Sequence, residues 1–234
     1  MRKQSGFTLI EIAIVLVIIG LLLGGVLKGQ ELITSARVRN LISQQDGIKA
    51  AYFGFLDRFR ALPGDYAQAT NNIANVTAGS NGNGNGQITA NGTAGATTDE
   101  HIAAWDHLSK AGFINGSYNY VAGAETTGST PTNPYSRYLR LVYDAVYAGV
   151  GATSRHNLKT GNQIPSDILA EVDRKVDDGV ADGGSFRFSA YDGGGVGGVA
   201  PTGPGAAVTD CYAAAAGPWT STSSAPNCGG TSLF

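Results

Sequence analysis

Hydrophobic residues are concentrated at the start of the chain. Between positions 7 and 27 every residue is apolar or glycine, except Thr8 and Glu11. A helix over these positions, rising 1.5 Å per residue, is about 30 Å long, the thickness of the hydrocarbon core of a bilayer. The pattern therefore predicts a transmembrane helix over residues 7–27, preceded by a short polar segment over residues 1–6.

After this run the pattern becomes amphipathic and continues without proline as far as Pro63. Apolar side chains recur at steps of three, four or seven residues, which is typical of one helix face. They are Leu41, Ile48, Tyr52, Phe55, Phe59 and Leu62. We therefore expect an amphipathic helix over residues 28–62, continuous with the first and stopped by Pro63-Gly64.

The remaining residues, 63–234, predict a globular domain. Repeated Asn-Gly pairs predict an exposed loop over residues 71–98. A helix is predicted over residues 97–113, with Thr97 and Glu100 as a capping box and Gly112 as its stop. Its core-facing residues would be Ile102, Trp105 and Leu108.

Two strands and one further helix complete the expected domain. Residues 137–149 alternate as a strand would and also fit a helix, but their β-branched and aromatic content favours a strand. Residues 165–176 predict a helix capped by Ser166, and residues 184–191 predict a strand with Phe186 and Phe188 facing inward. The fold class is therefore α+β: a long N-terminal α-helix, with a transmembrane half and an amphipathic half, packs on a small antiparallel β-sheet domain with extended loops.

Charge and motif content exclude several classes of function. The net charge is −2 and charged residues make up 15% of the chain, without the basic patch that nucleic-acid binding requires. The sequence contains no G-x-S-x-G, no metal-spaced Cys and His set and no P-loop. His101 and His107 are poorly spaced for a helical metal pair, so we expect surface or packing roles for them. We expect no enzymatic activity, no cofactor and no nucleic-acid partner.

Glu11 is the unusual residue of the apolar run. A charged residue at the centre of a membrane helix costs about 2.5–3.5 kcal/mol, so such a residue is a functional candidate that needs a partner. Arg2 and Lys3 place the N-terminus in the cytoplasm by the positive-inside rule. A cleaved secretory signal is shorter and ends in a small-residue site, whereas a plain anchor does not explain Glu11.

The stretch GFTLIE, preceded by Lys3, closely resembles the leader and processing site of type IV pilins and type II secretion pseudopilins. This resemblance implies that a membrane prepilin peptidase cuts between Gly6 and Phe7 and N-methylates Phe7. It also implies that Glu11 pairs with the N-terminal amine of a neighbouring subunit. In a low-dielectric bundle such pairing would set the register of the subunits more than their stability.

The resemblance implies a non-enzymatic structural subunit of a type IV pilus-like filament. The chain would be a precursor in the bacterial inner membrane and then part of an extracellular or periplasmic filament. Its partners would be further copies of itself, the prepilin peptidase and the pilus or secretion assembly machinery. A pseudopilin or a minor pilin has the same pattern. An alternative of another class is a membrane-anchored extracytoplasmic binding protein or hydrolase.

Cysteines and aspartates near the C-terminus are the last candidates. Cys211 and Cys228 follow an export-type segment, which favours one disulfide over two free thiols. Asp177, Asp178 and Asp182 offer oxygen ligands of the kind that calcium prefers, although the spacing is not that of an EF-hand. An Asp-Gly turn with solvated carboxylates is the alternative interpretation of these three residues.

Overall fold

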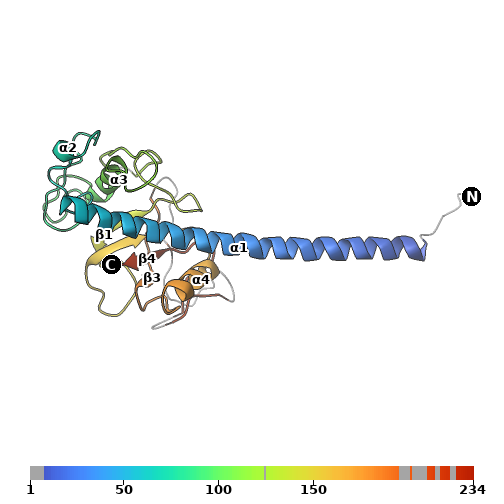
Figure 1. Cartoon of the computed structure of the whole chain (residues 1–234). Coiled ribbons are helices and arrows are strands. Elements are labelled where there is room, and N and C mark those ends of the chain that lie inside the picture. The colour runs from blue at the N-terminus through green and yellow to red at the C-terminus, as the bar shows by residue number, and fades with distance from the viewer. Residues whose placement is uncertain (1–7, 124, 195–200, 202–209, 214–216, 222–224) are drawn as a thin grey trace, which may run out of the picture. The chain divides into compact units, whose positions relative to one another are not determined.

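The computed structural model describes residues 8–123, 125–194, 201, 210–213, 217–221 and 225–234. The chain divides into two compact units, Met1–Arg37 and Val38–Phe234. The helices are α1 (Leu9–Phe59), α2 (Ala69–Asn72), α3 (Glu100–Lys110) and α4 (Ser166–Val176). The strands are β1 (Arg140–Asp144), β2 (Arg155–Lys159), β3 (Phe186–Phe188) and β4 (Gly230–Leu233) (Figure 1). The long helix α1 contributes residues to both units.

The part of α1 in the second unit buries one face. Its buried residues follow the expected helical spacing and are Val38, Leu41, Gln45, Ile48, Ala51, Tyr52 and Phe55. The amphipathic pattern of the sequence is therefore confirmed. The helix ends at Phe59, before the expected stop at Pro63-Gly64, because Arg60 adopts a left-handed conformation with φ of 55°. The amide of Arg60 still donates a hydrogen bond of 2.9 Å to the Leu56 carbonyl, which closes the last turn.

Four strands form one antiparallel sheet in the order β1-β2-β4-β3. In its register Leu141 pairs with Leu158, and both side chains are completely buried. The strand expected within residues 137–149 is β1, and the strand expected within residues 184–191 is β3. Phe186 and Phe188 are both buried, as the alternation predicts. The α+β fold class is therefore confirmed.

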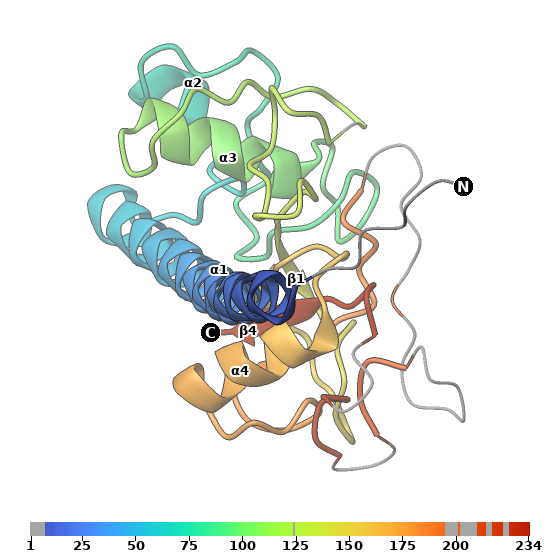
Figure 2. The ribbon, with the colours of Figure 1, turned by 90° about the vertical axis from the view of Figure 1, so that its right-hand side faces the viewer.

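Two hydrophobic clusters form the core of the second unit. One joins Phe55 of α1 to Trp105 of α3 and Leu158 of β2. The other joins Leu41 of α1 to Leu169 of α4 and to the strand β3. In Figures 1 and 2, α3 and α4 lie on opposite sides of the part of α1 that belongs to this unit. The amphipathic half of α1 is thus the shared centre of both clusters.

The expected capping box of α3 is wrong. The helix begins at Glu100, and its N-cap residue Asp99 makes no side-chain capping hydrogen bond. The buried Glu100 carboxylate instead accepts hydrogen bonds from the amides of Asn83 at 3.0 Å and Thr89 at 2.9 Å. These amides belong to the Asn-Gly loop, whose Ile88 is also completely buried. The carboxylate anchors this loop to α3 because the loop supplies buried donors that require an acceptor.

The expected N-cap role of Ser166 is also wrong. The helix α4 begins at Ser166 itself, after Pro165, and Ser166 makes no side-chain capping hydrogen bond. Its hydroxyl donates to the carbonyl of Thr220 and accepts from the amide of Ala225 at 2.9 Å. Ser166 therefore fastens the segment between the cysteines to α4.

A disulfide joins Cys211 to Cys228, as expected from the sequence, with their Cα atoms 5.6 Å apart. Both cysteines are completely buried in the cluster that contains α4 and β3. The segment between them contributes Tyr212 and Trp219 to the same cluster. The bridge therefore closes a chain segment that takes part in the core.

Candidate functional site

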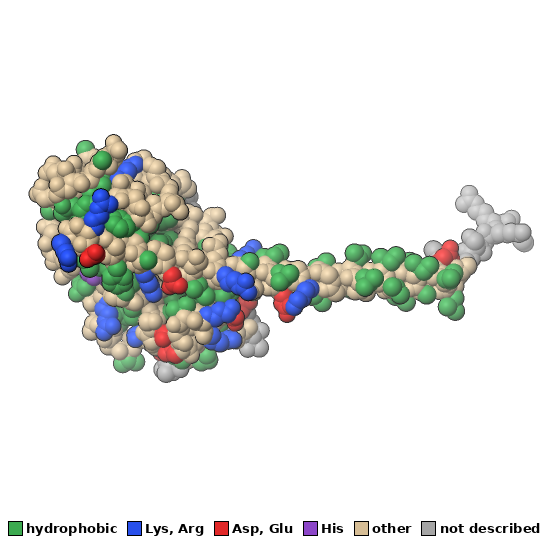
Figure 3. Space-filling view, in the orientation of Figure 1, with side chains coloured by type: hydrophobic (Ala, Val, Ile, Leu, Met, Phe, Trp, Pro, Cys, Tyr) green, Lys and Arg blue, Asp and Glu red, His purple; other side chains and the backbone are tan. Residues whose placement is uncertain are grey.

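The apolar N-terminal part of α1 has no cover from the described residues of the chain. Leu9 is 88% exposed and Leu21 is 73% exposed, and the most apolar window of the helix has no buried residue. By length and composition this helix could cross a membrane. Figure 3 shows hydrophobic side chains along this part of α1. A continuous exposed apolar surface of this kind marks a segment that contacts lipid or other protein chains.

Glu11 lies in the first turn of α1 and is held there by Thr8. One carboxylate oxygen, Oε2, accepts hydrogen bonds from the Thr8 amide and from the Thr8 hydroxyl, each at 2.7 Å. The Glu11 amide in turn donates to the Thr8 hydroxyl oxygen at 3.4 Å. This reciprocal arrangement is a capping box, because the side chains of the N-cap and N3 residues each satisfy a backbone amide.

The capping box leaves part of the Glu11 carboxylate available. Both donors from Thr8 reach Oε2, and none of the described residues donates to Oε1. A carboxylate with an open oxygen can still accept a hydrogen bond from an external amine. The sequence analysis missed the role of Thr8, although the spacing Thr-x-x-Glu ahead of an apolar run indicates a capping box.

The expected processing site lies outside the described residues. Gly6 and Phe7, together with the leader over residues 1–6, belong to the segment 1–7. Cleavage between Gly6 and Phe7 and methylation of Phe7 stay predictions. The described part of the motif begins at Thr8, one residue after the expected new N-terminus.

A second charged group lies beyond the apolar run. Lys28 and Glu31 form a salt bridge of 2.5 Å, and both side chains are exposed. An exposed ion pair one helical turn apart contributes little to stability. It lies directly after the apolar run that ends at Leu27.

The aspartates at the end of α4 do not group as the sequence predicts. Asp173, Asp177 and Asp178 each place one carboxylate oxygen within 4.8 Å of the others, and Asp182 is not part of this group. Asp173 joins because residues four apart lie on the same face of a helix, a spacing that the sequence analysis overlooked. Burial raises the pKa of Asp173 to about 6, and the hydrogen bond from Trp219 opposes this shift.

His107 has a packing role, in agreement with one of the two expected outcomes. Its Nδ1 accepts a hydrogen bond from the Gly64 amide at 2.9 Å, and its Nε2 lies 3.1 Å from the Ser80 carbonyl oxygen. Burial lowers the pKa of His107 to about 4, so the ring is neutral at pH 7. Both ring nitrogens of His107 are therefore used within the fold.

His101 is also buried and lies beside Glu125, with 3.8 Å between the Nε2 atom of His101 and the Oε1 atom of Glu125.

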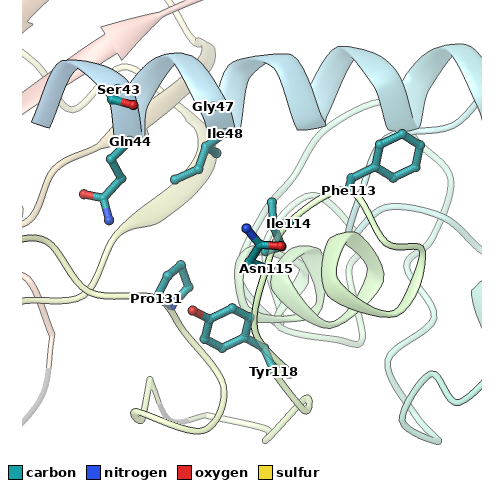
Figure 4. A pocket seen from close by; sticks show the side chains of 9 residues that line it. All are labelled: Ser43, Gln44, Gly47, Ile48, Phe113, Ile114, Asn115, Tyr118 and Pro131. Atoms are coloured by element: carbon teal, nitrogen blue, oxygen red, sulfur yellow. The ribbon is translucent and has the colours of Figure 1, made fainter. Parts of the chain in front are cut away.

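A pocket of about 390 Å³ opens beside α1 in the second unit. Figure 4 shows Gln44 and Ile48 on the helix facing Tyr118 and Pro131 on the opposite wall. The lining residues are Ser43, Gln44, Gly47, Ile48, Phe113, Ile114, Asn115, Tyr118 and Pro131. The lining is apolar or carries amide and hydroxyl groups, which suits contact with another molecule better than acid–base chemistry.

Comparison with known proteins identifies the N-terminal segment. Residues 1–27 match the family model of the prokaryotic N-terminal methylation motif. This motif is the hallmark of type IV pilins and pseudopilins made as precursors, so the match supports a type IV pilin-like or pseudopilin protein. The matched residues include Thr8, Glu11 and the uncovered apolar part of α1. No curated protein and no solved structure matches the chain.

Proposed function

We propose that this chain is the structural subunit of a type IV pilus-like filament. The main support for the proposal is the match of residues 1–27 to the methylation motif. The helix that bears this motif has an exposed apolar surface, and the Glu11 carboxylate lies in its first turn. The precursor sits in the bacterial inner membrane through residues 7–27. A prepilin peptidase cuts it between Gly6 and Phe7 and methylates Phe7. The mature chain then enters an extracellular or periplasmic filament.

Assembly buries the apolar part of α1 against the same part of neighbouring subunits. A methylene group that leaves water contributes about 0.8 kcal/mol to stability. A helix that leaves lipid gains stability from van der Waals packing against other helices instead. Apolar packing alone tolerates several registers, whereas a carboxylate in this environment requires a cationic partner. Cleavage before Phe7 creates such a cation, since the new terminal amine keeps its charge when methylated. We therefore assign Glu11 the role of setting register between subunits.

A type II secretion pseudopilin or a minor pilin is the nearest alternative, because the same motif supports it. A membrane-anchored binding protein or hydrolase is the alternative of another class. These candidates differ in abundance and in processing. A major pilin is the bulk protein of sheared surface filaments, and a plain anchored protein keeps its original N-terminus.

Mass spectrometry of the mature chain from its native host tests the processing step. We expect an N-terminal peptide that begins with methylated Phe7 and a chain that is enriched in sheared filaments. A mature chain that still begins at Met1, or one that begins after Leu27, would contradict the proposal. The first result would favour a plain anchor and the second a cleaved secretory signal.

The role of Glu11 is tested by Glu11→Gln, with Glu31→Gln as the matched control. Both substitutions remove one negative charge from the exposed part of α1, but only Glu11 lies within the apolar run. We expect Glu11→Gln to be cut after Gly6 and to lower the yield of sheared filaments at least tenfold, whereas Glu31→Gln assembles normally. Normal filament yield from Glu11→Gln would refute the pairing role.

A further inference from the structure

We propose that Asn115 is a site of spontaneous deamidation, which converts its neutral carboxamide into a carboxylate beside the pocket at α1. Asparagine is prone to this reaction, and most so before glycine, because glycine has no side chain to hinder the attacking backbone nitrogen. The site belongs to the second unit and does not depend on filament assembly. The chain contains five Asn-Gly pairs, which begin at Asn81, Asn83, Asn85, Asn91 and Asn115.

The reaction needs only water besides the chain itself. The backbone nitrogen of Gly116 attacks the Cγ atom of Asn115 and forms a new C–N bond. The bond between Cγ and Nδ2 breaks, and Nδ2 leaves as ammonia with the proton that the Gly116 nitrogen loses. Water then opens the succinimide ring at one of its two carbonyl groups, where its hydroxyl stays on the carbon and its proton returns to the nitrogen. The product at position 115 is aspartate or isoaspartate, according to which bond opens.

In four of the five pairs the attacking nitrogen is held in place. Each of these glycine amides donates a hydrogen bond of 2.8–3.3 Å to a carbonyl or carboxylate oxygen of another residue. An amide must break such a bond before its nitrogen can lose a proton and turn toward the side chain. The donors are the amides of Gly82, Gly84, Gly86 and Gly92, and the acceptors belong to Tyr66, Asp65 and Ala96.

The fifth pair lies in a segment without such restraints. The amides of residues 114–117 donate no hydrogen bond to any residue that the structure describes, and backbone bonds resume only at Phe113 and Tyr118. Asn115 and Gly116 are both exposed. A segment with exposed and unbonded amides changes conformation at low free-energy cost. The Gly116 nitrogen is therefore free to attack.

Asn91 shows that exposure alone does not distinguish the pairs. Asn91 and Gly92 are also exposed, and the carboxamides of Asn91 and Asn115 both lack hydrogen bonds to the described part of the chain. Gly92 and Gly116 both have positive φ, at 79° and 102°. The difference is the hydrogen bond of 2.8 Å from the Gly92 amide to the Ala96 carbonyl. Asn91 is therefore the matched comparison within the same chain.

Deamidation at Asn115 changes the charge of the pocket beside α1. Asn115 is one of the 9 residues that line this pocket, and none of them carries a charge (Figure 4). The product places a carboxylate there and makes the chain more acidic than its formal net charge of −2. A carboxylate attracts cationic groups and repels anionic ones. The pocket of the modified chain therefore favours a cationic partner group.

The experiment incubates the full-length chain in detergent micelles, at mildly alkaline pH, in water labelled with heavy oxygen. Trypsin cleaves after Arg60, Lys110 and Arg137, which places Asn115 in one peptide and the other four pairs in another. Mass spectrometry of these peptides measures the heavy oxygen that hydrolysis adds at each asparagine. We expect Asn115 to convert at least tenfold faster than Asn91.

Unfolding separates the effect of structure from that of local sequence. In guanidinium chloride both glycine amides are free, so the two sites should convert at similar rates. Equal rates in the folded chain, or a tenfold difference that persists in the unfolded chain, would overturn the proposal. So would an unmodified Asn115 in the folded chain after the unfolded chain has converted completely.

Asn115→Gln and Asn91→Gln form the matched pair of variants. Both replace an exposed asparagine whose carboxamide makes no hydrogen bond to the described residues, and glutamine cyclises far more slowly. Isoelectric focusing of the incubated chains measures the acidic form. We expect this form to disappear from Asn115→Gln and to persist in Asn91→Gln. The opposite result, or an unchanged amount in both variants, would contradict the assignment of Asn115.

Discussion

Removal of the disulfide between Cys211 and Cys228 should destabilise the second unit by about 3 kcal/mol. The bridge joins residues 17 apart in the sequence. In the chain-entropy relation, a closed loop of this length removes about 10 cal/mol/K from the unfolded ensemble, which is about 3 kcal/mol at 25 °C. The double substitution Cys211→Ala and Cys228→Ala removes the bridge and introduces no polar group into the core.

The position of the bridge adds a second cost. Both cysteines are completely buried, and the segment between them contributes Tyr212 and Trp219 to the core. Without the bridge this segment must be ordered by packing and by hydrogen bonds, among them those of Ser166 and the Trp219 contact with Asp173. Alanine also leaves small cavities in place of two sulfur atoms, which adds to the cost of losing the bridge.

Thermal unfolding of the full-length chain in detergent, followed by near-ultraviolet circular dichroism, measures the effect. For a unit of this size the midpoint should fall by about 6–12 °C. Reduction of the natural chain should lower the midpoint in the same direction, which separates loss of the bridge from loss of the sulfur atoms. A double variant that loses less than about 1 kcal/mol would refute the loop-closure argument.

Two further predictions concern pH and backbone conformation. The folded pKa of Asp173, about 6, lies above its unfolded value of about 3.9, so its contribution to stability is complete below pH 3.9 and is lost as pH rises through 6. The unfolding midpoint should therefore fall between about pH 4 and 6, and Asp173→Asn should flatten this dependence; an unchanged slope would contradict the assignment. Gly64→Ala should destabilise the chain by more than about 1 kcal/mol in urea unfolding, because at φ of 86° its Cβ would lie 2.1 Å from the Glu100 carbonyl oxygen. Natural stability in this variant would show that the contact relaxes at little cost.

The candidate functional segment could be predicted from local sequence alone. An unbroken apolar run with one carboxylate, after Lys3 and Gly6, needs no distant partner to be recognised. The predictions for Gly6 and Phe7 stay untested, since both lie in the segment 1–7. The capping box of Thr8 and Glu11 is equally local, and its spacing could have been found from the sequence.

The sequence by itself determined the long helix, the strand with inward Phe186 and Phe188, and the pairing of the cysteines. These features depend on periodicity within one segment, or on a pair that has only one possible partner. Only the tertiary structure decided the roles of Glu100, Ser166 and Asp173. Each offers hydrogen-bonding groups that a local partner could satisfy, but buried donors from distant segments compete for them. Burial makes an unsatisfied distant donor more costly than an uncapped helix end in contact with water, so long-range partners prevail.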